Sequence, residues 1–434
     1  MEKNYLRRSA SILFSVSLLG KGLTFGREVV TAYYFGTSLF KDGFVAAVSL
    51  AMLLYAPLLE PIMKLLVPKF LSSKRRAELA TVLVTELALI LAGSLVISLA
   101  IGPWLLPRLY PNLAPESILF GLKGLSLMTI YAVLFLFSNA LSQILYATHR
   151  YGMAEVRQVI FGLFVISFVI GGWSFAGIHP LLGGYLWGIV AVNVYLLAVM
   201  VHARLFASVT RRRYRRIRGI LTRFWRKFIS LIGVSVLSTL PDYWVQYQLG
   251  TFGPQILSAH DFGNRFYLFV SNLVVPALLT PYYTKISHLA AIGQFPLRLS
   301  IRLAVGLLLL GAGLAIGLAL LGTVSQTRYL MAGQFTEASF TLTRLFFLAY
   351  LLGFGVAAVS LQLTYVALAF NLHHIYVANI IVSGIATVCG VLLLRPFLGF
   401  LAIPLTIGFS YGVGIILQLI GLRIAFKRKG LVYV

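Results

Sequence analysis

Acidic residues are scarce in this sequence. Its 434 residues contain 11 Asp and Glu against 36 Lys and Arg, which gives a formal net charge of +25. The one cysteine, Cys389, excludes an intrachain disulfide, and the seven histidines form no ligand motif, so we expect no metal site. There is no Walker A or other glycine-rich nucleotide loop, so we do not expect ATP to drive the protein.

Long polar stretches are also rare, because 59% of the residues are hydrophobic and only 11% are charged. About 20 apolar residues cross a bilayer, and about twelve such runs are present. We therefore predict an all-α polytopic membrane protein with two six-helix lobes around a central cavity. The first run is too long and too charged for a cleaved signal peptide. The predicted spans are 9–35, 43–67, 79–103, 117–146, 156–177, 180–202, 228–250, 264–284, 301–323, 339–366, 373–394 and 398–421.

The basic residues alternate between the two sides of these spans. With the N-terminus in the cytoplasm, most of them lie inside, and the outside loops keep only Lys41, Arg108, Arg328 and Arg395. Positively charged loops stay in the cytoplasm. The distribution of the basic residues thus predicts that both termini lie in the cytoplasm. It also accounts for the net positive charge, so we do not expect nucleic acid as a partner.

One long basic segment, residues 204–227, divides the predicted spans six and six. It is either a solvated loop that enforces the topology or an amphipathic helix whose arginines meet anionic lipid headgroups. In both cases the predicted organisation is an N-terminal lobe at 1–203, a basic cytoplasmic linker at 204–227 and a C-terminal lobe at 228–434. We expect a monomer.

The two halves share a short pattern. The segment REVVTAYYFGT at 27–37 aligns with PDYWVQYQLGT at 241–251, which places Glu28 over Asp242 and the pair Gly36–Thr37 over Gly250–Thr251. An acidic residue inside each span, followed by the same Gly-Thr exit, indicates an internal repeat. Two lobes of equal span number and orientation are typical of transporters.

Several charges fall inside the predicted spans. Lys21, Arg27, Glu28 and Asp242 lie deep, where each charge costs at least about 2.5–3.5 kcal/mol. Lys21, Thr24 and Glu28 share a helix face. Glu60 and Lys64 form an i,i+4 pair. Buried ion pairs could merely hold helices together, but an excess of cations around one cavity favours an anionic substrate, and Arg and Lys bind phosphate well.

The segment GKGLTFGREVVTAYYFGTSLFKDGFVAA at 20–47 resembles the first helix and following loop of the lipid II flippases (MurJ), in the multidrug/oligosaccharidyl-lipid/polysaccharide exporter superfamily. The similar features are a basic residue, an Arg-acid pair and a later Asp, here Lys21, Arg27–Glu28 and Asp42. Glu60 occupies the place of the family's Glu in its second helix. SAHDFGNRFYLFVSNLVVPALLTPYYTKIS resembles a stretch of the second half, with Arg265 in place of a family arginine.

The resemblance implies a flippase of the bacterial plasma membrane. Such a protein moves a polyprenyl-(pyro)phosphate-linked glycan precursor from the inner to the outer leaflet by alternating access, without catalysis and without a cofactor other than Na⁺ or H⁺ as a possible coupling ion. Together with the buried charges above, it leads us to expect Lys21, Arg27, Lys64 and Arg265 to bind the substrate. We expect Glu28, Asp42, Glu60 and Asp242 to couple the ion or to provide cavity charge.

The sequence departs from this family in three ways. Glu28 replaces an Asp, and Tyr55 stands where the family has an arginine. Two further C-terminal spans of the lipid II flippases, which line a groove for the lipid tail, have no counterpart in this sequence. We therefore expect a lipid-linked glycan flippase more broadly, for a lipid II-like precursor or for a polysaccharide repeat unit.

Two other functions compete with this one. An ion-coupled multidrug antiporter of the same superfamily is the main alternative, although an acidic cavity would suit cationic drugs better than these arginines do. A membrane enzyme is the other, but its catalytic residues usually occupy a large outside loop, and the predicted outside loops are short.

Overall fold

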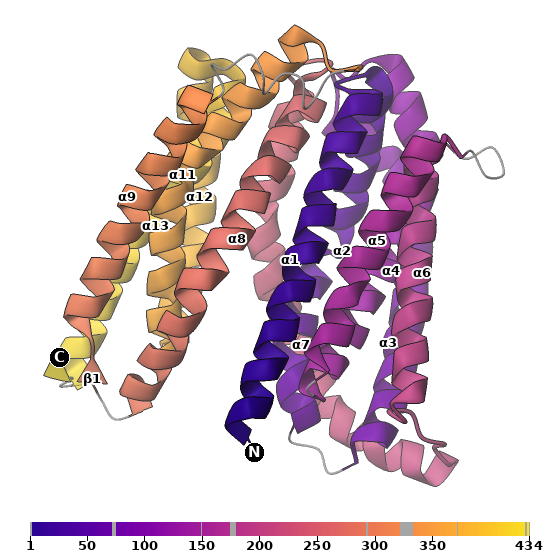
Figure 1. The fold of residues 1–434 in the computed structure, drawn as a ribbon, viewed down its shortest axis with the longest axis vertical. Helices are drawn as coiled ribbons and strands as arrows, with labels where there is room; N and C mark the ends of the chain where they lie inside the picture. The colour runs from indigo at the N-terminus through magenta and orange to yellow at the C-terminus, as the bar shows by residue number, and fades with distance from the viewer. Residues whose placement is uncertain are drawn as a thin grey trace. The chain divides into compact units, whose positions relative to one another are not determined.

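The computed structural model describes residues 2–71, 75–148, 150–173, 179–291, 294–321, 333–370, 372–429 and 432–433. Nearly all of these residues are helical (Figure 1). The chain divides into two compact units, Met1–Thr239 and Leu240–Val434, here called the N-terminal unit and the C-terminal unit. The all-α, two-lobe prediction is confirmed.

The N-terminal unit consists of long helices joined by short connections. Most of them extend beyond one or both ends of the predicted spans. Their bounds are α1 (Glu2–Phe35), α2 (Leu39–Leu71), α3 (Arg76–Leu109), α4 (Pro115–Ala147), α5 (Tyr151–Gly171) and α6 (Pro180–His202), followed by the first part of α7 (Arg211–Gly250).

Glycines allow these helices to approach closely, as is usual where helices pack in a membrane. Helix α2 packs along α4, and a Cβ at Gly43 would lie 2.3 Å from the carbonyl oxygen of Ser117. Helix α1 packs along α5, where a Cβ at Gly162 would lie 3.0 Å from the Cβ of Leu23. The α1–α5 contact is important for the site because it fixes which face of α1 points into the unit.

The C-terminal unit repeats the helical design. It contains the end of α7, then α8 (Ile256–Ala291), α9 (Leu297–Leu321), α11 (Glu337–Ala369), α12 (His373–Leu398), the 3-10 helix η2 (Gly399–Leu401) and α13 (Ala402–Lys429). Helix α11 packs against α8, α9 and α13. A short parallel pairing joins β1 (Gln294–Phe295) to β2 (Val432–Tyr433), and Phe295 packs with Phe370 and Phe426 beside it.

Helix α7 belongs to both units, because the division falls after Thr239, one residue before the Leu240–Pro241 pair within the helix. Its first part is amphipathic. Ile217, Leu221, Phe224 and Phe228 are buried on one face at helical spacing. The helical interpretation of the basic segment is thus confirmed from Arg211 onward, and the solvated-loop alternative is wrong there. The lobe and linker boundaries, and the lipid contact, stay predictions.

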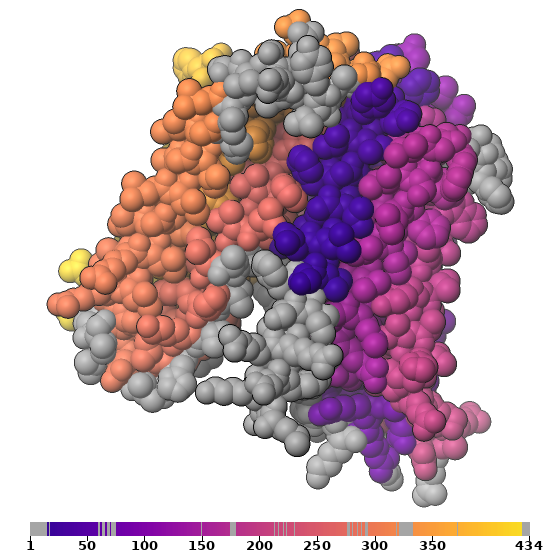
Figure 2. Space-filling view, viewed as in Figure 1, coloured from indigo at the N-terminus to yellow at the C-terminus, as the bar shows by residue number. Residues whose placement is uncertain are grey.

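Within the described residues, nine stretches are long and apolar enough to cross a membrane, and one of them contains both α12 and α13. The long helices missing from this set are α1 and α8, which carry the charge pairs described below. Exposed apolar side chains are common on the outside of each unit. Helix α9, with Leu309 and Ile316 more than 60% exposed, lies open on the face shown in Figure 2. This is the surface expected of a polytopic membrane protein.

Candidate functional site

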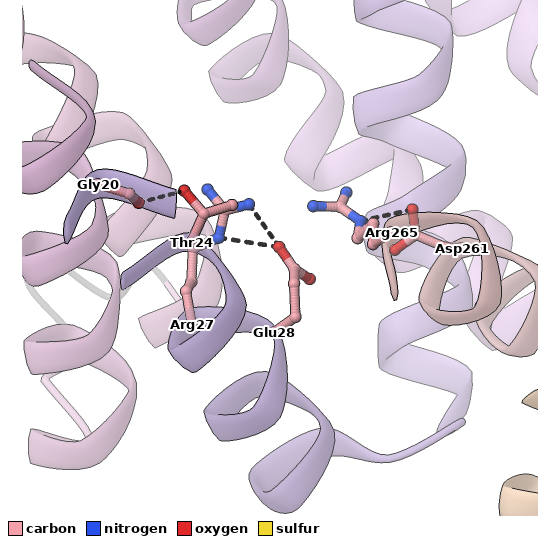
Figure 3. A network of polar contacts seen from close by, with 6 residues as sticks. All are labelled: Gly20, Thr24, Arg27, Glu28, Asp261 and Arg265. Carbon is pink, nitrogen blue, oxygen red and sulfur yellow. Dashed lines mark hydrogen bonds and ion pairs between the residues drawn. The ribbon is translucent and has the colours of Figure 1, made fainter. Parts of the chain in front are cut away.

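The charge pair on α1 is buried inside the N-terminal unit. Arg27 is 8% exposed and Glu28 is 3% exposed. The Arg27 Nε donates to Glu28 Oε1 at 2.9 Å, and an Arg27 NH2 group donates to the same oxygen (Figure 3). A paired charge is much cheaper to hold at membrane depth than a lone one. The prediction that Lys21, Thr24 and Glu28 share one face did not include the contact between Glu28 and its neighbour Arg27.

Aromatic rings from two other helices surround the same guanidinium. The Arg27 Cζ atom lies 5.2 Å from the ring centre of Phe161 on α5 and 5.3 Å from that of Tyr185 on α6. These two rings meet edge to face, 5.4 Å apart. Cation–π attraction of this kind is strengthened where water is excluded. Arg27 is thus held by three helices of one unit.

Lys21 and Thr24 precede this pair on α1. Lys21 is half-buried, and the Thr24 hydroxyl donates to the backbone oxygen of Gly20 at 2.9 Å, as Figure 3 shows. A Cβ at Gly20 would lie 2.9 Å from the Cβ of Gln158, so this turn of α1 also packs against α5. Lys21 therefore lies about a turn and a half before Arg27 on the same helix.

Lys41 and Asp42 occupy the first turn of α2 and are both fully buried. The Lys41 Nζ lies 5.0 Å from the ring centre of Phe44. The prediction that Lys41 belongs to an outside loop is wrong as to the loop, because α2 begins at Leu39 and Lys41 is buried in its first turn; the side of the membrane stays a prediction. Asp42 is favoured there by the positive end of the helix dipole.

The second helix also carries the predicted pair Glu60 and Lys64. Both residues lie within α2, but their side chains fall outside the described part of the chain. Tyr55, which replaces a family arginine, is buried at 2% exposure.

In the C-terminal unit, Arg265 pairs with an acid that the sequence analysis did not select. The Arg265 Nε donates to Asp261 Oδ1 at 2.8 Å, one turn earlier on α8 (Figure 3). Both side chains are mostly buried, at 21% and 15% exposure. The i,i+4 spacing, acid first, is visible in the sequence and could have identified Asp261. No such signal exists for Phe161 or Tyr185, which meet Arg27 only through helix packing.

Asp242 lies on the last part of α7 and is exposed. Its carboxylate is close enough to interact electrostatically with the phenols of Tyr350 on α11 and Tyr411 on α13.

Both predicted Gly-Thr exits end their helices: α1 ends at Phe35, directly before Gly36, and α7 ends at Gly250. Among the described residues, no group of three or more His, Cys, Asp or Glu could hold a metal ion.

The fold and these sites define the class of the protein: a polytopic helical membrane protein of two units, each with a cation–carboxylate pair inside a helix. Comparison with known proteins assigns the chain to a family. The sequence profile of the lipid II flippase MurJ family matches residues 31–433. The chain belongs to that family. A comparison with curated protein sequences found no match.

Solved structures show the same fold. A lipid II flippase MurJ in an inward closed conformation is 17% identical, with a TM-score of 0.79 over 96% of this chain and 87% of that one. An inward-facing multidrug resistance MATE transporter of the MOP superfamily is 12% identical, with a TM-score of 0.63 over 97% and 99%. A MOP superfamily transporter from Pyrococcus furiosus is 11% identical, with a TM-score of 0.52 over 97% and 94%.

Proposed function

We propose that this protein moves a polyprenyl-(pyro)phosphate-linked glycan precursor from the inner to the outer leaflet by alternating access. Membership of the MurJ family supports the class of substrate. The single observation that carries the proposal is Arg27, a buried cation of helix α1 that is held in position by Glu28, Phe161 and Tyr185. Such a guanidinium is suited to bind a phosphate group.

Arg27 and Arg265 then provide one phosphate contact in each unit. Each is already paired with a carboxylate in its own helix, so an arriving phosphate shares or replaces Glu28 or Asp261. In either case the cation stays paired with an anion throughout. Lys21 and Lys64 complete the proposed cationic set.

The acidic residues are proposed to carry the coupling ion. Asp242 is the best placed of them because it lies near two phenols, whereas Glu28 is engaged with Arg27. Asp42 and Glu60 are proposed as charges that shape the path. Na⁺ and H⁺ are both compatible with a single carboxylate.

The test is headgroup translocation in proteoliposomes. We expect Arg27→Ala and Arg265→Ala to lose most of the wild-type rate, about tenfold or more, because each removes a charge-assisted contact worth roughly 1.5–3 kcal/mol. Arg298→Ala is the control, since Arg298 is exposed at the start of α9. If both site variants fold normally and translocate the headgroup at the wild-type rate, the assignment of Arg27 and Arg265 as phosphate contacts is wrong.

The multidrug antiporter remains the competing function. The structural likeness to MATE transporters shows the shared fold alone, and the buried cations favour an anion. Overexpression that raises resistance to cationic drugs, and loses this effect in Asp242→Asn, would favour the antiporter instead.

A further inference from the structure

A buried histidine directly precedes the acid of the charge pair in the C-terminal unit. His260 is 5% exposed and lies next to Asp261 on α8. Its Nε2 atom lies 2.6 Å from the hydroxyl oxygen of Tyr350 on α11, and its ring meets the ring of Phe346 edge to face at 5.3 Å. The imidazole interacts electrostatically with the Asp261 carboxylate. His260 is thus a titratable group held in a fixed place beside this carboxylate.

The groups around the partner of His260 are phenols and one acid. Tyr267 on α8 stacks on Tyr350, with the ring centres 5.2 Å apart. Tyr350 also interacts electrostatically with Asp242 on α7 and with Tyr411 on α13. Neutral phenols leave the charge on His260 to be decided mainly by the carboxylates and cations near it.

The arginines of the helices that meet at His260 are bonded elsewhere. Arg344, the one arginine of α11, turns to α9 and donates to the backbone oxygen of Ala319 at 3.3 Å. Strand β1, which also packs on α8, contains no titratable residue. Arg265 on α8 donates to Asp261 at 2.8 Å. Arg265 is therefore the cation with which a charged His260 would share Asp261.

The charge balance of this site changes when a phosphate arrives. In the resting pair, Arg265 offsets Asp261, and a neutral His260 adds no charge. If the phosphate takes Arg265, Asp261 has one positive charge less beside it, which is costly for a carboxylate that is only 15% exposed. A proton on His260 restores a positive charge at the adjacent residue. The nearby carboxylate in turn makes a buried imidazolium less costly.

We propose that His260 takes up a proton when a phosphate draws Arg265 away from Asp261. This rests on the proposed function, which assigns Arg265 to the phosphate. The proton comes from solvent and bonds to a ring nitrogen of His260, and no bond of the substrate forms or breaks. Tyr350 suits both states, because a phenol donates to a neutral ring nitrogen and accepts from a charged one. The proton compensates charge and is distinct from the coupling ion proposed at Asp242.

The test counts the protons taken up per ligand bound, by titration calorimetry of the purified full-length protein in buffers that differ in ionisation enthalpy. The probe is a methyl diester of polyprenyl phosphate, because a phosphate monoester itself titrates near about pH 6. We expect the wild type to take up as much as about one proton per ligand near neutral pH. Its affinity should then rise up to about tenfold for each pH unit of acidification. A wild type that takes up no proton overturns the proposal, and this result needs no variant.

A matched pair of variants identifies the group that binds the proton. His260→Gln keeps a hydrogen-bonding side chain but cannot titrate, whereas His374→Gln makes the same change on an exposed histidine in the first turn of α12. We expect the proton uptake to be lost in the first variant and unchanged in the second. Uptake that persists in His260→Gln overturns the proposal and assigns the proton to another group, with Asp261 the first candidate.

Asp261→Asn provides a check that leaves His260 in place. Without the carboxylate there is no charge for His260 to compensate, so we expect this variant to bind the probe without taking up a proton. Uptake equal to that of the wild type would contradict the proposal.

The two proposals fail differently. Proton uptake on binding of the probe, with no translocation of a glycan headgroup in the same preparation, would refute the proposed function alone. Normal translocation, with binding of the probe that takes up no proton, would refute the role of His260 alone.

Discussion

Arg27 and Glu28 are neighbours in sequence, so their side chains leave the α1 helix about 100° apart. They nevertheless bond to each other, because α5 and α6 close around Arg27 and leave its guanidinium within reach of Glu28. At the scale of single residues, the site is therefore a neutral ion pair packed against two aromatic rings.

The pair gives a stability prediction. Arg27→Gln and Glu28→Gln each leave one buried charge without its partner, and each should cost about 3–5 kcal/mol. The double variant should cost much less than the two together. Thermal unfolding of the purified protein in detergent measures all four states of this cycle. Additive costs would show that the two side chains do not depend on each other.

His179 gives a prediction about pH. It lies just before α6, where its ring nitrogen accepts from the backbone N–H of Leu181 at 3.3 Å and its ring packs near Phe35 and Phe120. Burial lowers the pKa of His179 below its usual 6.5. Because the pKa of His179 is depressed in the folded state, the contribution of His179 to stability is complete above about pH 6.5 and declines as the pH falls below that value.

We therefore expect the wild type to lose melting temperature between about pH 6.5 and 5 more steeply than His179→Asn, which cannot titrate but can still accept at the helix start. Melting curves across this range make the comparison. Parallel curves for the two proteins would mean that His179 does not titrate there.

At the scale of elements, close glycine contacts decide where the helices lie. Gly43→Ala should separate α2 from α4, since the new Cβ would lie 2.3 Å from the backbone oxygen of Ser117. We expect a loss of roughly 1–3 kcal/mol, as for other overpacked sites. Gly93→Ala on α3 is the control because its Cβ meets nothing within 4 Å. That change should be neutral or stabilising by up to about 1 kcal/mol, and similar unfolding of both variants would contradict this account.

The basic first part of α7 is attached to α3 by two acids of unequal importance. Glu86 accepts from the Trp225 indole N–H at 2.6 Å and from the Tyr214 hydroxyl at 3.2 Å. Glu78 meets Arg213 at 3.2 Å, but the Arg213 side chain is 57% exposed. Bonds to a charged acceptor contribute about 1.5–3 kcal/mol when protected, and exposed ion pairs about 0–1 kcal/mol.

Glu86→Gln should therefore loosen this part of α7, whereas Glu78→Gln should not. Limited proteolysis within 205–227 and the fluorescence of Trp225 report the change. Faster cleavage in the Glu78 variant than in the Glu86 variant would reverse this order of importance.

For the whole molecule, the number and length of the apolar runs were sufficient to predict the helical fold and its two lobes, and the Gly-Thr exits of α1 and α7 were visible as a repeat. The aromatic partners of Arg27 could not be predicted from the sequence, because Phe161 and Tyr185 lie more than a hundred residues away and meet Arg27 only through helix packing. Lys41 was predicted in a loop because the predicted second span begins at 43, whereas α2 already begins at Leu39. Asp261 was predictable from its spacing to Arg265.

Orientation is the prediction that belongs to the whole chain. With Cys389, which is exposed, replaced by serine, we expect Ser208→Cys to react with an impermeant thiol reagent only after the cytoplasmic side is opened. Asn112→Cys should react in intact cells. Both positions are exposed, so access rather than burial decides the outcome. The opposite pattern would reverse the predicted topology.

The bond between Glu86 and Trp225 also constrains how the protein is made. The two residues are 139 positions apart. At about 5–20 residues per second, a ribosome needs roughly 7–28 s to reach the second after the first. During that interval the carboxylate of Glu86 must stay in contact with water or be protonated, because an ionised acid in hydrocarbon is costly. Before α7 is made, helix α3 can therefore settle into the membrane only with Glu86 protonated or still in contact with water.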